Sequence, residues 1–518
     1  MDAAMAKDGA HAGVELEIKL TGAPAYVAAL RDSALFRKFA AGEGGWERLI
    51  STYYDTADAR LEKAGASLRL REEEGGRVQA MKLAAVGAFG RLEEEIALAD
   101  GETFPRPPHT DEFAALLAHS NGALNPVART LVDRYAVMIE RKGAVIEAAL
   151  DLGRAEGWRN GAMVSAAPLA EAEFELISGD PKALFSAARK CLKQSEGRLR
   201  LTVAPKLEQA RRLARPFAAV NPDVRLLLEA DVTTGAVLAA SLTHCATRMA
   251  DCISAIVDLR EPEGVHQMRV ALRRFRAIER LFRKAASDKR LNMLAEEARA
   301  LMQTLGAARD WDVFLAETLP HELPGGYAAD GLKALKARAE ALRASAWDRA
   351  ARKIAGADFS IFALRILEAA HRIAAAEGAE LDENVKAFAA RALDWRLEKA
   401  RAVAAGIDDA SPAANHPLRI ELKKLRYAAQ TFRSLYPKDA RKPYMGAMSR
   451  LQDAFGALND AVVAQTLANE AALGQGREAA RAAGFIAGWR AGEAQEQAGA
   501  VGESWRAFSA LAPFWRDD

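Results

Sequence analysis

VELEIKL, at residues 14–20, alternates apolar and charged side chains without a break. Successive side chains of a β-strand point to opposite faces of its sheet, so Glu15, Glu17 and Lys19 share one face and the four aliphatic residues share the other. For a single strand, a solvated outer face is favoured by about two to one over a charged interior. The interpretation therefore depends on whether the pattern recurs.

Period-two alternation does recur along the N-terminal part of the chain. It predicts eight strands, at 14–20, 48–55, 66–73, 77–83, 91–98, 132–140, 144–151 and 170–177. Helical patterns cover 24–40 and 181–194. Because eight strands are enough to close a barrel, we expect an α+β domain in which an eight-stranded antiparallel β tunnel or barrel is flanked by helices.

The charged faces of these strands carry both signs. Arg69, Arg71 and Lys82 alternate with apolar residues on two strands, and Glu171 and Glu173 do so on another. A closed interior lined with such groups is too costly to leave dry and unpaired. A polyanion held by the bases and a divalent metal held by the carboxylates would balance it, and hard oxygen ligands suit Mg²⁺ or Mn²⁺.

The pattern changes between residues 205 and 222, where Pro205, Pro216 and Pro222 bracket a basic stretch. Beyond it, Ala, Leu, Arg and Glu recur at helical periods nearly to the end. The sequence therefore predicts two domains behind a disordered tail. Their expected bounds are 1–13 for the tail, 14–210 for the strand-rich domain, 211–223 for a linker and 224–516 for an all-α domain.

The helical half contains an internal repeat. HQMRVALRRFR begins at His266, and HPLRIELKKLR begins at His416, 150 residues later. LGAARDWDV and FGALNDAVV begin at Leu305 and Phe455, again 150 residues apart. Two matches at one offset indicate a duplicated unit, so we expect two helical bundles related by a pseudo-two-fold axis.

Each copy opens with a basic stripe on one helix face, because its cationic residues recur three and four positions apart. A solvated face is favoured by about three to one for one such helix. Here, however, acidic partners one turn away are scarce and the stripe occurs twice. We therefore predict a groove that binds phosphate groups. Its predicted residues are His266, Arg269, Arg273, Arg276, His416, Arg419, Lys423 and Arg426.

Composition and short motifs exclude several classes of protein. The net charge is only +2, and the three cysteines form no C-x-x-C pair, so we expect reduced thiols and a cytoplasmic location. No apolar run predicts a membrane span, and a G-x-x-x-x-G-K-S/T phosphate loop is absent. Aromatic residues are not interleaved with the basic stripes, which disfavours nucleic acid and makes Tyr427 and Tyr444 packing residues.

Six blocks resemble, in family order, the CYTH domains or triphosphate tunnel metalloenzymes: VELEIKL, YYDTADARLEKAGASLRLREE (53–73), VQAMKL, RLEEE, EAALDLG and EAEFELISGD. The resemblance implies a tunnel that binds a linear triphosphate. It implies metal ligation by Glu15, Glu17, Glu171 and Glu173, with Glu15, Glu17 and Lys19 as catalytic residues. The phosphate contacts that it implies are Lys19, Arg69, Arg71, Lys82, Arg134 and Lys206. Arg129 and Arg141 stay open as alternatives to Arg134 on the sixth strand.

Both repeats of the helical half resemble the CHAD family, over about residues 224–516. This resemblance implies two four-helix bundles and binding of inorganic polyphosphate in a basic groove. The residues that match the second motif of the family are Asp310, Asp312, Asn459 and Asp460. We expect them to brace the arginines across the groove rather than to contact the ligand.

Together the resemblances imply an inorganic triphosphatase that uses Mg²⁺ or Mn²⁺ to convert tripolyphosphate into pyrophosphate and phosphate. The CHAD domain would bind polyphosphate and could associate the protein with polyphosphate granules. Without a serine or cysteine nucleophile motif, direct attack by water is favoured. Two alternatives stay open: a polyphosphate-binding protein without turnover, and a CYTH adenylate cyclase or thiamine triphosphatase, which would need an apolar wall at the tunnel mouth.

Overall fold

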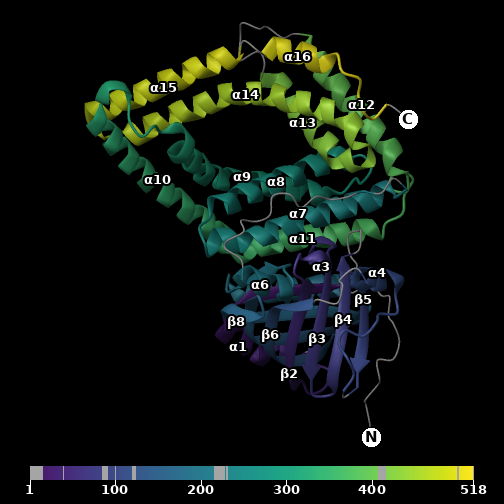
Figure 1. The fold of residues 1–518 in the computed structure, drawn as a ribbon. Coiled ribbons are helices and arrows are strands. Elements are labelled where there is room, and N and C mark those ends of the chain that lie inside the picture. Colours follow the sequence, from purple (N-terminus) through teal and green to yellow (C-terminus); the bar gives the residue numbers. More distant parts are fainter. Residues whose placement is uncertain are drawn as a thin grey trace. The chain divides into compact units, whose positions relative to one another are not determined.

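The structure is a computed structural model (Figure 1) and describes residues 16–38, 40–84, 91–99, 101–118, 124–214, 228, 231–405, 416–498 and 501–516. The chain divides into two compact units. The first contains the residues up to Asn221 together with Ala355–Glu368, and the second contains the remainder. The predicted tail at 1–13, Glu15 and residues 215–223 of the predicted linker lie outside the described residues.

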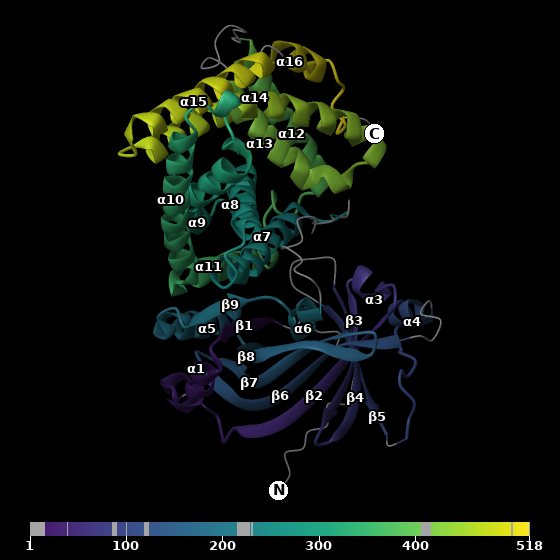
Figure 2. The same ribbon diagram turned by 60° about the vertical axis from the view of Figure 1, so that its left-hand side comes forward.

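Nine antiparallel strands form one sheet in the first unit, in the order β5-β4-β3-β2-β6-β7-β8-β1-β9. They are β1 (Glu17–Gly22), β2 (Gly45–Thr56), β3 (Ala66–Glu73), β4 (Gly76–Ala84), β5 (Arg91–Leu98), β6 (Leu124–Arg141), β7 (Ala144–Arg159), β8 (Ala162–Ser178) and β9 (Leu199–Thr202). All eight predicted strands are confirmed, and the additional β9 has only four residues. The sheet is strongly curved (Figure 2), and within the described strands no ladder joins β5 to β9.

Six helices accompany the sheet: α1 (Pro24–Ala29), α2 (Ala34–Lys38), α3 (Arg60–Lys63), α4 (Asp111–Ala118), α5 (Pro181–Ser195) and α6 (Lys206–Ala214). The predicted helix over 24–40 is interrupted at Ser33, where the backbone is extended. α5 begins as predicted, because the Asp180 carboxylate accepts the Lys182 amide and Pro181 fits the first turn. The sequence analysis placed the end of this domain at residue 210. In the structure α6 continues to Ala214.

The two faces of the sheet differ chemically. Phe174 on β8 and Leu20 on β1 are fully buried on one face, where Phe174 contacts Phe36 of α2 and α5 covers the strands. Alternate residues of the same strands, such as Lys19 and Glu173, point to the opposite face, which we call the polar face. α6 packs on the polar face through an apolar cluster. This cluster contains Tyr53, Ala128, Val132, Ala155, Leu169, Leu207 and Ala210.

After α6 the described chain forms only helices and their connections, as predicted for the all-α part. The α-helices are α7 (Thr234–Val257), α8 (Pro262–Phe282), α9 (Lys289–Val313), α10 (Ala329–Ala355), α11 (Ala357–Ala374), α12 (Val385–Ala404), α13 (His416–Phe432), α14 (Lys438–Ala472), α15 (Gly476–Ala498) and α16 (Val501–Ser509). None of the described helices is long and apolar enough to cross a membrane. Cys191, Cys245 and Cys252 are all buried.

Equivalent residues of the two repeats meet each other. Thr233 and Asn384, the N-caps of α7 and α12, are 151 residues apart, one more than the repeat offset, and pair in an isolated antiparallel bridge. Phe282 and Phe432, which are 150 residues apart in the sequence, have ring centroids 5.9 Å apart at the ends of α8 and α13. Residues contact their own equivalents only close to a two-fold axis. These contacts support the predicted pseudo-two-fold duplication and place α8 beside α13 on that axis.

Candidate metal centre and basic groove

Three carboxylates converge on the polar face. Asp151 on β7 lies directly opposite Glu171 on β8, and Glu173 is the next residue of β8 on that face. One oxygen of each carboxylate lies within 4.8 Å of the others, and all three residues are buried. Because buried like charges repel strongly at this separation, the cluster needs cations beside it to stay ionised.

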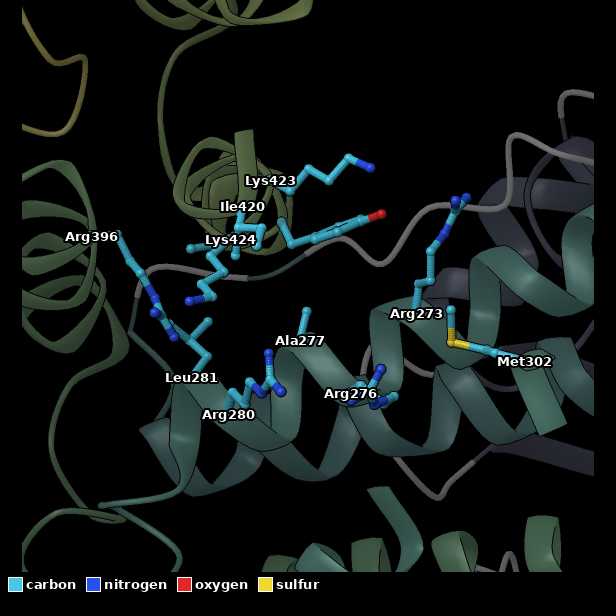
Figure 3. Close-up of a pocket in the computed structure, with 12 residues that line it drawn as sticks. Arg273, Arg276, Ala277, Arg280, Leu281, Met302, Arg396, Ile420, Lys423 and Lys424 are labelled. Carbon is cyan, nitrogen blue, oxygen red and sulfur yellow. The ribbon is translucent and has the colours of Figure 1, made fainter. Parts of the chain in front are cut away.

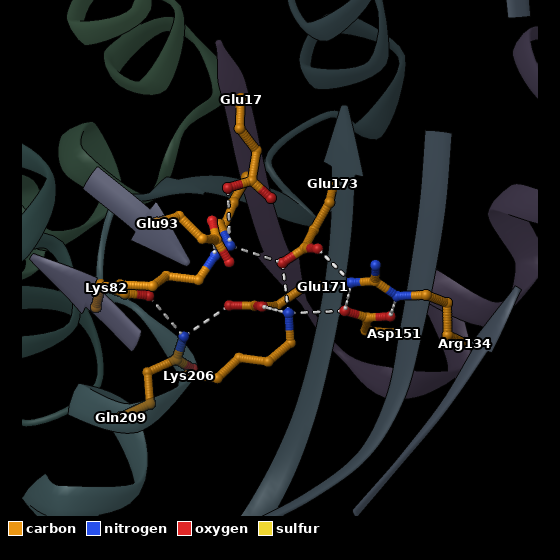
Figure 4. Close-up of polar contacts among 11 residues, drawn as sticks. Glu17, Lys82, Glu93, Arg134, Asp151, Glu171, Glu173, Lys206 and Gln209 are labelled. Carbon is orange, nitrogen blue, oxygen red and sulfur yellow. Dashed lines mark hydrogen bonds and ion pairs between the residues drawn. The ribbon is translucent and has the colours of Figure 1, made fainter. Parts of the chain in front are cut away.

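Arg134 and Lys206 supply much of this compensation (Figure 4). Arg134 on β6 forms a bidentate ion pair with Asp151, with both contacts at 2.7 Å, and it reaches Glu173 at 2.5 Å. Lys206, the first residue of α6, lies 2.7 Å from Asp151 and 3.1 Å from Glu171. Its ammonium group also contacts Glu173. The start of α6 therefore links all three carboxylates.

Two further side chains complete the network. Lys19 on β1 lies 2.9 Å from Glu173 and 3.0 Å from Glu17. Lys19 therefore connects Glu17 to the three carboxylates. Gln209, on the same helix as Lys206, donates its side-chain amide to Glu171 at 2.6 Å. The Glu17 carboxylate is also more exposed, at 28%, than that of Glu173, at 7%. Glu17 thus lies at the edge of the network.

The ion pairs determine which groups are charged. Burial would raise the pKa of Glu173, but Lys206 and the other two cations outweigh burial and hold that pKa well below its usual value. Burial would lower the pKa of Lys206, but the carboxylates, led by Glu173, raise it well above its usual value. Glu17 behaves differently, because burial raises its pKa and Lys19 offsets this only in part. At neutral pH the centre holds fully charged Glu173 and Lys206.

A more basic zone lies on the same face of β3 and β4. The strand register places Arg69, Arg71 and Lys82 on the polar face. Arg69 and Lys82 each pair with a glutamate of β5, at 3.1 and 2.6 Å. Burial, followed by the nearby charges of Arg69 and Arg134, lowers the pKa of Arg71. This zone thus presents crowded guanidinium groups next to the carboxylates.

The strand register places the three candidate arginines of the sixth strand on two different faces. Arg129 and Arg141 are an odd number of residues from Arg134 along an uninterrupted β6–β7 pairing, so their side chains leave β6 from the opposite face. The sequence analysis missed Asp151 as a metal-ligand candidate, although Asp151 alternates with Glu147 in the EAALDLG block. It also missed Gln209, for which the sequence contains no signal.

The residues of this centre fit a hard divalent cation. Asp151, Glu171 and Glu173 offer the oxygen donors that Mg²⁺ and Mn²⁺ prefer. Glu171 Oε2 is buried and accepts no hydrogen bond from any described residue, because the 3.1 Å approach of Lys206 lies outside hydrogen-bond geometry. Two of the four predicted ligands therefore belong to the cluster, Glu17 lies beside it, and Glu15 is outside the described residues.

The second candidate site is a pocket of about 220 Å³ between α8 and α13 (Figure 3). No acidic residue is among those that line it. The Nε atoms of Arg273, Arg276 and Arg396 are buried and have no hydrogen-bond partner among the described residues. The cationic lining residues are Arg273, Arg276, Arg280, Arg396, Lys423 and Lys424. The lining of the pocket therefore carries positive charge without an acidic residue among its members.

The charge imbalance perturbs Lys423 directly. Burial, then Arg419 and Arg273, lower the pKa of Lys423 to about 8. Its neighbour Lys424 differs, because it pairs with Glu421 at 2.5 Å. A bound anion would relieve the repulsion around Lys423.

The predicted stripe residues fall into two groups. Arg273, Arg276 and Lys423 line the pocket, whereas Arg269 donates to the Met302 carbonyl at 2.9 Å and Arg426 donates to a glutamine of α14 at 2.6 Å. His266 lies on α8, where burial lowers its pKa, with nearby arginines adding to the effect. The side chains of His416 and Asn459 lie outside the described part of the chain. The sequence analysis missed Arg396 and Lys424 as lining residues.

The acidic residues of the second motif do not act alike. Asp310 lies close to Arg269, and burial raises its pKa although Arg269 opposes this effect. Asp312, in contrast, accepts hydrogen bonds from Arg343 at 2.6 Å and from Trp347 at 3.0 Å. The expectation of bracing across the groove therefore fits Asp310 and is wrong for Asp312, which holds α10 against α9.

The sequence matches the CYTH domain family over residues 14–207 and the CHAD domain family over residues 240–469. Among solved structures, the CHAD domain from the plant Ricinus communis is 28% identical, covering 57% of this chain and 98% of that chain with a TM-score of 0.48. PptA from Streptomyces chartreusis is 19% identical, covering 53% and 100% of the two chains with a TM-score of 0.39.

A third similar structure, from Hippeastrum, is described as an adenylyl cyclase with a dominant triphosphatase activity. It is 17% identical, and the match covers 38% of this chain and 95% of that chain with a TM-score of 0.27. The CYTH match covers the sheet with its buried carboxylates, and the CHAD match covers the duplicated helices with their basic stripes. The chain therefore consists of a CYTH-family domain over residues 14–207 followed by a CHAD-family domain over residues 240–469.

Proposed function

We propose that this protein is a metal-dependent inorganic triphosphatase that hydrolyses tripolyphosphate to pyrophosphate and phosphate. The observation that carries the proposal is the buried cluster of Asp151, Glu171 and Glu173, with cations on one side and the basic zone of β3 and β4 on the same face. A linear triphosphate needs charge neutralisation along its length and a metal at one point. The polar face offers both.

Different residues of the polar face would bind the substrate and hold the carboxylates. Arg69, Arg71 and Lys82 would bind phosphate oxygens of the substrate, because each is a donor on the polar face. Arg134 and Lys206 would hold the carboxylates in place, since both already contact them. Positioning and charge neutralisation account for most of the catalysis of phosphoryl transfer.

Asp151, Glu171 and Glu173 would hold the metal, with Glu17, and Glu15 by the family resemblance, as further carboxylates. A divalent cation bound there would supply charge neutralisation and a more acidic water. In the reaction, a water oxygen bonds to a terminal phosphorus, the bridging P–O bond breaks with pyrophosphate leaving, and one proton of the water is released. The sequence offers no covalent nucleophile motif that would replace this water.

The CHAD domain would bind inorganic polyphosphate along α8 and α13. The supporting observation is the pocket with six cationic residues and no acidic one. Phosphate binding would give the buried arginine Nε atoms of this pocket the hydrogen-bond partners that they lack among the described residues. Such binding would weaken steeply with salt, because bound polyanions release counterions.

The direct test is phosphate release from tripolyphosphate with Mg²⁺ or Mn²⁺. Glu171→Gln should lower the turnover about 100-fold or more, because it removes one charged donor of the metal centre. Glu208→Gln, on the solvent side of α6 where Glu208 pairs with Arg212, is the matched control and should leave the rate unchanged. A folded wild type that releases no phosphate with either metal would instead support polyphosphate binding without turnover. Cyclic AMP formation from ATP would support the cyclase alternative.

A further inference from the structure

Half of the pocket between α8 and α13 is not basic. Its remaining lining residues are Ala277, Leu281, Met302, Ile420, Tyr427 and Ala428. Ile420 is 41% exposed although it sits within a basic helix face. Inorganic polyphosphate has no apolar part that could cover such a wall. The lining therefore suits a ligand that has both an anionic and an apolar part.

The first cause of this lining is a break in the pseudo-symmetry. Tyr427 of α13 and Ala277 of α8 are equivalent positions, 150 residues apart, and both line the pocket. The sequence analysis treated Tyr427 as a packing residue, like Tyr444, which is indeed buried among aromatic rings. Tyr427 instead presents its ring to the pocket, and the small side chain of Ala277 leaves space opposite.

A second difference between the repeats explains why the open volume of the pocket lies beside the first repeat. Gln452 of α14 accepts a hydrogen bond from Arg426 at 2.6 Å and donates to the Leu422 carbonyl at 2.9 Å. At the equivalent position α9 carries Met302, which cannot make these bonds. Arg276, the equivalent of Arg426, therefore has no such glutamine to donate to, and the Met302 thioether adds apolar surface.

Cations stand at both ends of the apolar part (Figure 3). Arg273 and Lys423 lie at one end, close enough for Arg273 to lower the pKa of Lys423. Arg280 and Arg396 lie at the other. Arg396 is only 6% exposed, stacks on Trp395 at 4.4 Å, and has a buried Nε atom with no partner among the described residues. A buried guanidinium nitrogen that lines a pocket and lacks a hydrogen-bond partner among the described residues is typical of an anion site.

We propose that this pocket binds a nucleoside polyphosphate, with the base against Tyr427 and the phosphates on the cations at its ends. Aromatic rings stack on bases of every kind, and the apolar residues around Tyr427 would cover the edges of the base. A volume of about 220 Å³ is small for a whole organic ligand but gives room for one ring system, so the phosphates lie at the rim. The inference rests on the proposed phosphate binding along α8 and α13.

The test measures binding of ATP and of tripolyphosphate to the full chain in the absence of divalent metal. Tyr427→Ala, which copies the residue of the first repeat, should weaken ATP binding about tenfold and change tripolyphosphate binding less than about twofold. Tyr427→Phe should restore ATP binding. Tyr327→Ala, a substitution of an exposed tyrosine that does not line the pocket, should change neither affinity.

Photolabelling with 8-azido-ATP locates the site independently of affinity. The label should fall on peptides of α8 or α13, and Tyr427→Ala should remove it. Label found only on the strands of the sheet, or unchanged ATP affinity in Tyr427→Ala, would overturn the inference. If Arg273→Met/Lys423→Met also leaves the binding of long-chain inorganic polyphosphate unchanged, the proposed phosphate groove fails as well. If that double variant weakens polyphosphate binding, only the nucleotide inference fails.

Discussion

The two charged sites of this molecule solve the same electrostatic problem in opposite ways. On the polar face, Asp151, Glu171 and Glu173 each contact a cation of the protein itself. In the pocket between α8 and α13, Arg276 and Arg396 have buried Nε atoms without hydrogen-bond partners among the described residues. The first site is compensated within the protein, whereas we expect the second to be compensated by a bound anion.

This difference has consequences for ligand binding. A compensated site must exchange existing ion pairs for new ones, so the net gain depends on geometry and on the metal. An uncompensated site gains directly from the charge of its ligand, and its affinity should depend strongly on salt and pH. Removing one charge should therefore destabilise the fold at the first site and relieve strain at the second.

The largest effect should come from Glu173→Gln. Glu173 is shared by Lys19, Arg134 and Lys206, so its loss leaves three partly buried cations with too few acids. Breaking a buried ion pair costs about 3 kcal/mol, which urea denaturation would measure as a lower free energy of unfolding. Phosphate release should fall about 100-fold or more in the same variant. A loss of stability below about 1 kcal/mol would show that the cations do not depend on Glu173.

The stability that Glu173 contributes should also depend on pH in one direction. The folded-state pKa of Glu173 is lowered, so its contribution is fully present above the unfolded-state value and is lost as pH falls through the folded-state value. The difference in unfolding free energy between wild type and Glu173→Gln should therefore shrink in acid. A difference that grows in acid would contradict the assignment.

How much the sequence predicts depends on whether a feature is periodic. Strand alternation predicts all eight longer strands and the face that carries Lys19, Arg69 and Glu173, because side-chain direction follows from backbone geometry alone. The same alternation places Asp151 on this face. The sequence analysis did not select Asp151, because β8 contains more glutamates and was preferred. Gln209 could not be predicted, since its contact with Glu171 depends on how α6 docks on the sheet.

The basic groove shows the same limit. The 150-residue repeat predicts that α8 and α13 are equivalent, and the structure places them side by side. Equivalence by itself predicts a symmetric groove, however. The pocket arises where the repeats differ, at Ala277 against Tyr427 and at Met302 against Gln452, and only the packing shows that such differences share one cavity. Arg396 comes from α12, outside the repeated motif altogether.

A smaller effect concerns the pH dependence of polyphosphate affinity, which should distinguish the pocket from the polar face. Because the pKa of Lys423 is about 8 without a ligand, and an anion favours the charged form, binding of polyphosphate takes up a proton above that pH. The affinity should therefore fall as pH rises through about 8. Lys423→Arg should bind without this dependence, since arginine stays charged. A wild-type affinity that is flat between pH 7 and 9, as titration calorimetry would measure it, would show that Lys423 does not contact the anion.

The smallest effect concerns stability and has the opposite sign to that of Glu173. The folded-state pKa of Lys423 lies below its usual 10.5, so the charged lysine destabilises the fold below about pH 8, and this penalty disappears as pH rises towards 10.5. Lys423→Met should therefore raise the melting temperature of the helical unit by about 2 °C at pH 7 and by less at higher pH. Lys424→Met is the matched control, because Lys424 pairs with Glu421 and its loss should lower the melting temperature or leave it unchanged. If both variants lower it equally, the pocket is as well compensated as the polar face, and the contrast between the two sites disappears.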